Sequence, residues 1–372
     1  MRPRIAIIGA RSVPGRYGGF DTVATELAPR LVQRGIDLTV YCQPRYSQPD
    51  RADAYQGVEL VYLPAARSQS LETISHEVLA LAHALPRRYD ALYVLGTRAS
   101  AIYAPAIAMR TPVFFNTDGH DWKRRKWGRR AQQYLRWSER AAVRLAPTRL
   151  VADSRAIAAY FADTYGVAPT YLTYGANLLS SVDPAPLTRY GLRPASYLLV
   201  LCRLEPENNV DLIIEAYRRL GSDMPLVVVG GTNFDSTYIQ RLRSLAPTGA
   251  RFLGAIYEPE VVDSLYYHSY AYIHGHEVGG TNPALLHAMG AGCCVLANDV
   301  VYNREVLADT GLYWQPTASD LRDVMEKVLR DGAAVATLRR ATQERARRAY
   351  DWEVIADGYV ELFSRGSRSR RV

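Results

Sequence analysis

Short apolar runs alternate with amphipathic segments along most of the chain. In the first half, seven runs have the pattern of buried β-strands: RIAIIGA, DLTVYCQ, VELVYLP, ALYVLG, PVFFNTD, RLVADS and PTYLTYG. Segments with helical periodicity lie between most of them, such as residues 20–35 and 71–85. Continuous apolar strands that alternate with helices are typical of parallel sheets covered on both faces. The pattern therefore predicts an α/β fold.

The alternation lapses once, around residues 176–195, where Pro and Ser are frequent, and then restarts with YLLVLCRL, PLVVVGG, RFLGAI, AYIHG and CCVLAND. We read this lapse as an interdomain linker. The prediction is an N-terminal domain over 1–180 and a C-terminal domain over 181–351. A helix over 352–365 is expected to return and complete the first domain, followed by a basic, unstructured tail over 366–372.

The composition is that of a globular protein, with 48% hydrophobic and 22% charged residues in 372. No apolar run approaches the roughly 20 residues that a membrane-spanning helix needs. The N-terminus runs directly into a strand pattern, without the cleavage region of a signal peptide. Four cysteines show no metal-binding spacing: Cys42, Cys202, Cys293 and Cys294. We therefore expect a cytoplasmic protein with reduced thiols.

The formal net charge of +8 suits an anionic partner, such as a nucleotide or a phospholipid surface. No zinc-finger spacing or RNA-recognition signature is present, so nucleic acid is not an expected partner.

The end of the first predicted strand excludes two common nucleotide chemistries. In GARSVPGRYGGFDT, residues 9–22, a dinucleotide fingerprint would need glycine where Arg11 and Pro14 stand. The chain also contains no Gly-Lys-Ser/Thr of a phosphate-binding P-loop. Hydride transfer and nucleoside-triphosphate hydrolysis are therefore not expected, and a glycine-containing loop before a helix remains.

A second glycine loop lies in HGHEVGGTNPALLHAMG, residues 274–290. Gly279 and Gly280 allow unusual backbone angles and the close approach of a ligand. Asn282 is a good N-cap, and Pro283 suits the first helical position. Such a helix start can bind an anion. The same residues would also make an ordinary glycine-rich turn.

Four segments at strand ends together resemble one enzyme family: GARSVPGRYGGFDT, FFNTDGHDWKRRKWGRR, CRLEPENN and VGGTNPALLHAMGAG. They resemble the retaining glycosyltransferases of family 4, and more closely a bacterial branch that includes rhamnosyltransferases of polysaccharide assembly. The resemblance covers nearly the whole chain. It implies the GT-B fold, in which two Rossmann-like, doubly wound domains face each other across a cleft. The C-terminal domain would bind a nucleotide-sugar donor.

The resemblance also implies which residues bind the donor. Arg203 matches the family arginine that pairs with the diphosphate, for which a guanidinium offers two parallel hydrogen bonds. The donor-binding residues that we expect are Arg203, Asn208, Glu277, Gly279, Gly280, Thr281, Asn282 and His287. The loop expected to hold acceptor or phosphate contains Tyr17, Gly18 and Gly19.

The sequence departs from the family at three of these positions. Gly279 and His287 stand where most members have two glutamates, the second of which holds the ribose. His287 could still bond a hydroxyl, or could simply pack in its helix. Asn208 stands near the place of a lysine and supplies no charge, so Arg203 should matter more.

For catalysis, the resemblance points to the end of PVFFNTD. Asp118 takes the place of a family histidine near the reacting sugar, with His120 and Asp121 nearby; each could also cap the following helix. Retaining glycosidases use two close carboxylates, and no such pair is evident here. The family's usual proposal is a front-face substitution in which the diphosphate receives the acceptor's proton. We expect no metal and no cofactor.

The stretch WKRRKWGRR, residues 122–130, combines six basic residues with two tryptophans. It suggests peripheral contact with the anionic inner face of a membrane. It could also bind an anionic acceptor or be a solvated charged surface.

The sequence therefore predicts a retaining glycosyltransferase of cell-surface polysaccharide biosynthesis. It would transfer a sugar, L-rhamnose from dTDP-rhamnose in the first instance, to a glycan or lipid-linked glycan. Two alternatives stay open: a nucleotide-sugar 2-epimerase of the same fold, and a non-catalytic subunit that binds nucleotide or glycan.

Overall fold

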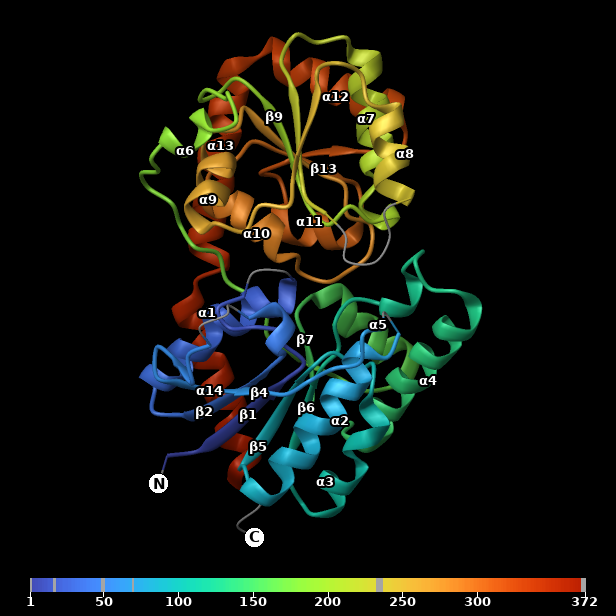
Figure 1. Cartoon of the computed structure of the whole chain (residues 1–372), viewed down its shortest axis with the longest axis vertical. Helices are drawn as coiled ribbons and strands as arrows, with labels where there is room; N and C mark the ends of the chain where they lie inside the picture. The colour runs from blue at the N-terminus through green and yellow to red at the C-terminus, as the bar shows by residue number, and fades with distance from the viewer. Residues whose placement is uncertain (1, 16–17, 48–50, 69, 232–236, 369–372) are drawn as a thin grey trace. The chain divides into compact units, whose positions relative to one another are not determined.

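The chain forms two compact α/β units in a computed structural model that describes residues 2–15, 18–47, 51–68, 70–231 and 237–368 (Figure 1). The first unit consists of Met1–Lys123, Trp127–Tyr174 and Trp352–Val372, and the second of Arg124–Lys126 and Gly175–Asp351. Each unit contains one sheet with helices on both faces.

The sheet of the first unit has the order β3-β4-β2-β1-β5-β6-β7-β8. Its strands are β1 (Arg4–Ile8), β2 (Asp37–Cys42), β3 (Ala54–Tyr55), β4 (Val58–Tyr62), β5 (Ala91–Leu95), β6 (Val113–Asn116), β7 (Leu150–Ala152) and β8 (Thr170–Tyr171). Among the described residues of this sheet, β3 pairs antiparallel with β4, and the other pairs are parallel.

The sheet of the second unit is entirely parallel, in the order β11-β10-β9-β12-β13-β14. Its strands are β9 (Leu198–Leu201), β10 (Leu226–Val229), β11 (Ala250–Gly254), β12 (Ala271–His274), β13 (Val295–Asn298) and β14 (Leu312–Trp314). This is the Rossmann order, in which the winding direction reverses between β9 and β12. In such sheets, ligands bind beyond the carboxyl ends of the two strands at the reversal.

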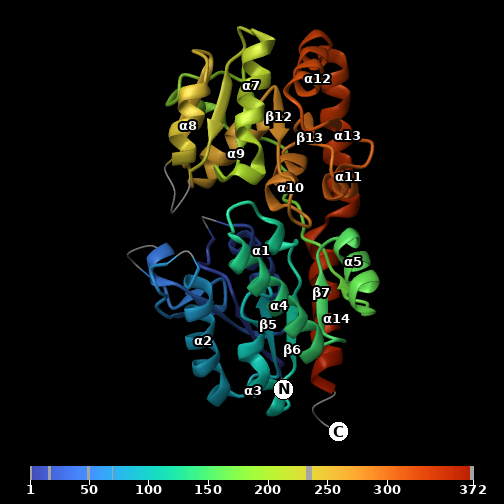
Figure 2. The same cartoon turned by 90° about the vertical axis from the view of Figure 1, so that its right-hand side faces the viewer.

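The helices of the first unit are α1 (Gly19–Gln33), α2 (Glu72–Ala84), α3 (Ala104–Ala108), α4 (Arg129–Leu145), α5 (Arg155–Tyr165) and α14 (Trp352–Arg368). Those of the second unit are α6 (Ala185–Thr188), α7 (Val210–Leu220), α8 (Thr237–Leu245), α9 (Pro259–Tyr267), α10 (Pro283–Gly290), α11 (Val301–Leu307), α12 (Ala318–Arg330) and α13 (Gly332–Ala349). In the second unit, α7, α8 and α12 lie on one side of β9 and β13, and α9, α10 and α13 lie on the other (Figures 1 and 2).

Helix α7 shows how the sequence pattern produces this layering. Its apolar positions Val210, Ile213 and Ile214 are fully buried in the core against the strands. On its exposed face, Glu215 pairs with two arginines one turn further along the helix. The three-to-four-residue spacing of the apolar side chains therefore places one face of α7 on the sheet and leaves the charged face in water.

Helix α14 packs beside α1 in the first unit, far from it in sequence (Figure 1). Arg34 donates to Asp357 at 2.6 Å and to Glu353 at 2.9 Å. Tyr359 is fully buried, and its hydroxyl lies 3.0 Å from that of Tyr93 on β5. The helix continues through Arg368, so the prediction of an unstructured tail from 366 was wrong for its first three residues; 369–372 lie outside the described residues.

The short elements that the sequence analysis missed include β3, β14 and α6, which lies inside the predicted linker. They span only two to four residues each, too few for a periodic pattern to show. Within the described part of the chain, no helix is both long and apolar enough to cross a bilayer.

Candidate functional site

Arg203 follows β9, at the point where the winding of the second sheet reverses. Its side chain is one-third exposed, and Nη1 lies 3.8 Å from Oε1 of Glu205. This separation is too long for a hydrogen bond, so Glu205 does not use the N–H groups of the Arg203 guanidinium. Arg203 is therefore placed where a diphosphate could approach it.

Glu205 is a partly buried carboxylate among positive charges. Burial raises its pKa, but the charges of Arg203 and Lys126 outweigh this effect and lower the pKa to about 2. Lys126 Nζ lies 3.1 Å from Oε1 of Glu205. Lys126 thus supplies, close to Arg203, a positive charge that Asn208 lacks.

Asn208 has a structural contact instead. The side chain is buried, and Nδ2 donates to the backbone carbonyl of Arg203 at 2.7 Å. A Cβ on Gly275, after β12, would lie only 2.2 Å from the carbonyl oxygen of Asn208. The segments that follow β9 and β12 are therefore in direct backbone contact, and glycine is required at 275.

The glycine loop and its helix start have the predicted local structure. Gly279 has φ +147°, a conformation that L residues rarely adopt, and a Cβ there would meet nothing within 4 Å. Asn282 caps α10 and accepts from Ala284 N at 2.9 Å, and Pro283 is the first helical residue. The prediction of this cap is confirmed. Gly280 and Thr281 are buried beside the open space at Gly279.

His287 lies on α10 between two contacts within the second unit. Its Nε2 lies 2.8 Å from Oδ1 of Asp263, and its ring stacks on Tyr266 with centroids 4.6 Å apart. Both contacts come from α9. The side chain therefore helps to hold α9 against α10, and its predicted role toward a ribose stays a prediction.

The middle of the basic stretch is neutralised by glutamates of the second unit. Arg125 Nη2 lies 2.7 Å from Oε2 of Glu277. Arg124, which is buried, has Nη1 3.6 Å from Oε1 of the buried Glu207. Together with Lys126, three of the six bases that suggested a membrane contact therefore have acidic partners.

Two histidines at the end of β12 were not singled out from the sequence. His274 is fully buried, and its ring stacks on that of His276 with centroids 4.3 Å apart and an angle of 13° between the planes. Burial lowers the pKa of His274 to about 3. The HGH pattern was visible in the sequence, but nothing in it distinguished a stacked pair from ordinary strand residues.

The loop after β1 in the first unit is organised by one buried carboxylate. Asp21 accepts from Arg11 N at 2.7 Å and from Gly18 N at 3.1 Å. Gly18 is the N-cap of α1, and Gly19 is its first residue. Burial raises the pKa of Asp21. Tyr17 lies outside the described residues.

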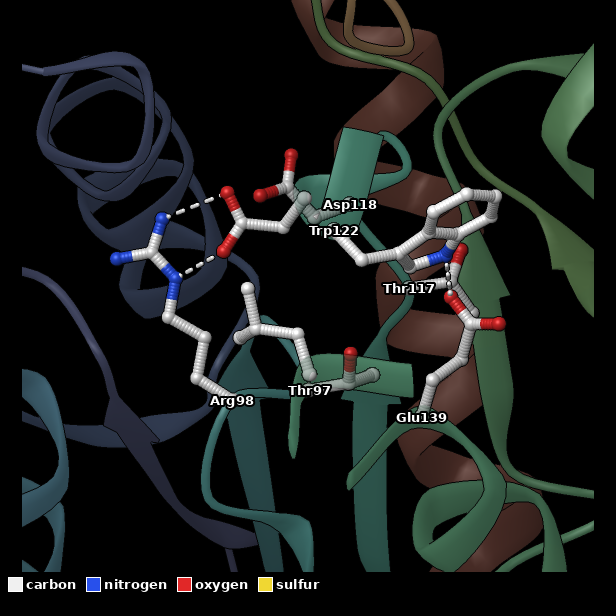
Figure 3. A pocket seen from close by; sticks show the side chains of 8 residues that line it. Thr97, Arg98, Thr117, Asp118, Trp122 and Glu139 are labelled. Atoms are coloured by element: carbon white, nitrogen blue, oxygen red, sulfur yellow. Dashed lines mark hydrogen bonds and ion pairs between the residues drawn. The ribbon is translucent and has the colours of Figure 1, made fainter. Parts of the chain in front are cut away.

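Asp118 follows β6 and has φ +51°. Its backbone N donates to Oδ1 of Asn116 at 2.9 Å, and its own Oδ1 accepts from Gly119 N at 2.7 Å. The side chain lines a small pocket of about 10 Å³, room for about one water (Figure 3). The pocket is lined by Thr97, Arg98, Thr117, Asp118, Asp121, Trp122, Leu135 and Glu139.

Asp121, also predicted as a catalytic candidate, is held by Arg98 in a two-bond fork. Nη2 of Arg98 donates to Oδ1 of Asp121 at 3.0 Å, and Nε of Arg98 donates to Oδ2. Such a bidentate pair fixes both side chains. This geometry favours a structural role for Asp121.

His120 is buried among aromatic rings. Its ring lies edge-on to Tyr160, with centroids 4.2 Å apart, and next to Trp122. Burial, with a contribution from Lys123, lowers the pKa of His120 to about 4. The imidazole is therefore neutral at pH 7 and does not serve as a charged acid.

Glu139 on α4 organises these rings and was also missed by the sequence analysis. Its carboxylate accepts from Trp122 Nε1 at 3.2 Å, from Tyr160 at 2.9 Å and from Tyr165 at 2.6 Å. Figure 3 shows the Trp122 bond on the side of the pocket opposite Arg98. A mid-helix glutamate gives no sequence signal, because its partners come from two other segments, the loop after β6 and α5.

Across the described ranges, no three His, Cys, Asp or Glu side chains are grouped so that they could hold a metal ion.

Comparisons with known proteins agree with this architecture. Residues 2–177 match the family model "Domain of unknown function (DUF1972)", and residues 193–349 match "Glycosyl transferases group 1". No match was found among curated protein sequences.

Solved structures share the fold at low sequence identity. Sucrose-phosphate synthase from Thermosynechococcus elongatus is 18% identical, with 98% of this chain and 99% of that chain covered and a TM-score of 0.82. HepE from Anabaena, in complex with UDP and glucose, is 17% identical, with 98% and 100% covered and a TM-score of 0.79. An α,α-trehalose-phosphate synthase (UDP-forming) from Burkholderia vietnamiensis is 12% identical, with 98% and 97% covered and a TM-score of 0.72.

The two Rossmann-like units and these neighbours define the GT-B fold, as the sequence predicted. Residues 193–349 form a glycosyl transferases group 1 domain. The family resemblance is confirmed to that extent, while the retaining mechanism and the rhamnosyl specificity stay predictions.

The buried histidine of β12 makes stability depend on pH. The folded pKa of His274 lies below the value of about 6.5 in an unfolded chain, so its contribution is complete above pH 6.5 and is lost as the pH falls toward 3. The slope is up to about 1.4 kcal/mol per pH unit. We expect wild type to lose more melting temperature between pH 7 and pH 5 than His274→Phe, which keeps a ring for stacking. Parallel losses in both proteins would show that His274 does not titrate on unfolding.

Proposed function

We propose that the protein is a retaining glycosyltransferase that transfers a sugar from a nucleotide-sugar donor to a glycan or lipid-linked glycan of the cell surface. L-Rhamnose from dTDP-rhamnose is the first donor to test. The observation that carries the proposal is the position of two segments. Arg203 follows β9 and the glycine loop follows β12, the two strands at the reversal point of the second sheet.

The donor side combines the groups that a diphosphate requires. Arg203 offers a guanidinium, and the Lys126 ammonium lies near it in an ion pair with Glu205. The capped start of α10 and the open space at Gly279 lie in the other segment of the same site. Solved neighbours in complex with UDP or UDP-glucose support a nucleotide sugar as the ligand.

In the first unit, we propose that Asp118 orients the acceptor. Its backbone is fixed by Asn116 and its carboxylate lies at the end of β6. In a front-face substitution, the acceptor hydroxyl attacks on the side of the leaving diphosphate. Catalysis then depends on stabilising that diphosphate and on orienting the hydroxyl. His120 is neutral and Asp121 is paired, so we assign both to holding the loop in shape.

We also keep the cytoplasmic location and the peripheral membrane contact as proposals. The exposed bases of the stretch are Lys123, Arg125, Arg129 and Arg130, of which Arg125 is paired with Glu277.

A donor screen tests the function directly. The protein would be incubated with dTDP-rhamnose, UDP-glucose and related nucleotide sugars, with and without lipid-linked glycan acceptors, and the products identified by mass spectrometry. Nucleoside diphosphate released together with glycosylated acceptor supports transfer. Conversion of the donor without acceptor supports an epimerase, and binding without turnover supports a non-catalytic subunit.

Arg203→Ala should weaken nucleotide-sugar binding and turnover without unfolding the protein. Loss of a hydrogen bond to a charged group costs about 1.5–3 kcal/mol, which corresponds to roughly 10- to 150-fold in affinity. The measurement is calorimetric titration with dTDP and UDP, alongside kcat/KM. Arg241→Ala, at an exposed arginine of α8, is the matched control. Equal behaviour of the two variants would remove Arg203 from the site.

Asp118→Asn should lower kcat at least about 10-fold with donor affinity unchanged, because it removes the charge that orients the acceptor. Asparagine tolerates the positive φ at this position and can still accept from Gly119 N. Asp121→Asn is the comparison: it weakens the Arg98 fork, so its melting temperature should fall and its activity should follow the folded fraction. A wild-type kcat in Asp118→Asn would contradict the assignment.

A further inference from the structure

The segment between β12 and the glycine loop is held rigidly by side-chain amides. Asn303 donates from Nδ2 to the carbonyl of His276 at 3.1 Å. Asn209 donates to the carbonyl of Gly275 at 2.8 Å and to Oε2 of Glu277 at 3.3 Å. Gly275, His276 and Glu277 each accept a hydrogen bond from an asparagine side chain, and the two asparagines lie in different segments of the chain. Such support is typical of a site whose side chains must keep one orientation.

His276 lies at the centre of this segment, with its ring stacked on His274. Nδ1 of His274 lies 3.0 Å from the hydroxyl of Tyr272, and this contact fixes the ring of His274 in the stack. Burial lowers the pKa of His276 well below its usual value, and the neighbouring His274 and the charge of Arg203 lower it further. The ring of His276 is therefore neutral at pH 7, and it lies close enough to Arg203 for that charge to lower its pKa.

One ring nitrogen of His276 makes no hydrogen bond within the described residues. Its Nδ1 is buried and has no hydrogen-bond partner among them, while the residue as a whole is partly exposed. A buried ring nitrogen without a partner is costly unless a ligand or water completes it. A neutral imidazole has one N–H donor and one acceptor nitrogen.

We propose that His276 is a further donor-binding residue that hydrogen-bonds a hydroxyl of the sugar to be transferred. A hydroxyl both donates and accepts, as a neutral imidazole does, whereas a diphosphate requires the charge that Arg203 supplies. His274 is a positioning residue, which holds the ring of His276 from behind. This inference rests on the proposed function and assigns the sugar-recognising part of the same site.

The test separates sugar recognition from diphosphate binding. Dissociation constants would be measured by calorimetry for two pairs of probes, dTDP with dTDP-L-rhamnose and UDP with UDP-glucose. For His276→Phe, which keeps the stacked ring and removes both nitrogens, we expect nucleotide-sugar affinity to fall about 5- to 10-fold. Affinity for the nucleoside diphosphate should stay within about twofold of wild type. Arg203→Ala should weaken both members of a pair.

Two further variants complete the design. His276→Gln keeps a donor and an acceptor, so it should retain more sugar discrimination than His276→Phe, and it carries the test should the phenylalanine variant fail to fold. His268→Gln is the control, because His268 Nε2 bonds the carbonyl of Val182 at 2.9 Å and has no place in the proposed site.

Equal weakening of diphosphate and nucleotide sugar in His276→Phe, or no weakening of either, would overturn the inference. Binding of no nucleotide at all by wild type would overturn the proposed function and this inference together. The first two results leave the proposed function intact, so the two failures are distinguishable.

Discussion

The whole arrangement depends on the parallel pairing of β9 with β12. Parallel strands place all their carboxyl ends at one edge of the sheet, and the Rossmann order sends the chain away in opposite directions from these two strands. β9 leads through α7 to β10, and β12 leads through α10 to β13 on the other side of the pair. The segments that follow the two strands are therefore the ones that can present Arg203 and the glycine loop to a common ligand. The contact between Gly275 and Asn208 shows how closely these two segments approach.

A second constraint is the handling of buried polar groups. In the first unit, the carboxylate of Glu139 accepts hydrogen bonds from a tryptophan and two tyrosines that lie around a neutral histidine. In the second unit, a stack of two neutral histidines lies within electrostatic reach of Arg203. Burial keeps the imidazoles uncharged, so the charge near the proposed donor site comes from arginine, lysine and glutamate. Neutral rings next to fixed charges allow sugar and phosphate to be recognised by different groups.

Features set by residues close together in the sequence were predictable, whereas side-chain contacts between distant residues were not. The cap at Asn282, the strands after which Arg203 and Asp118 stand, and the two α/β units follow from patterns within about 20 residues. The contact of Asn208 with the Arg203 carbonyl and the Arg98–Asp121 fork depend on side-chain directions that no spacing reveals. The basic stretch shows the same limit, since its partners Glu205, Glu207 and Glu277 lie about 80 to 150 positions further along the chain.

The position of α14 has a consequence for how the protein is made. The first unit needs this helix to cover α1 and to bury Tyr359 against Tyr93, yet the segment 175–351 of the second unit comes before it in synthesis. On the ribosome, the β-strands of the first unit are synthesised early. About 180 further residues follow before α14 can pack beside α1 on one face of their sheet. The second unit can fold as a nearly continuous segment during that interval. The first unit is therefore the part of the nascent chain that exposes apolar surface longest and has most need of chaperone protection.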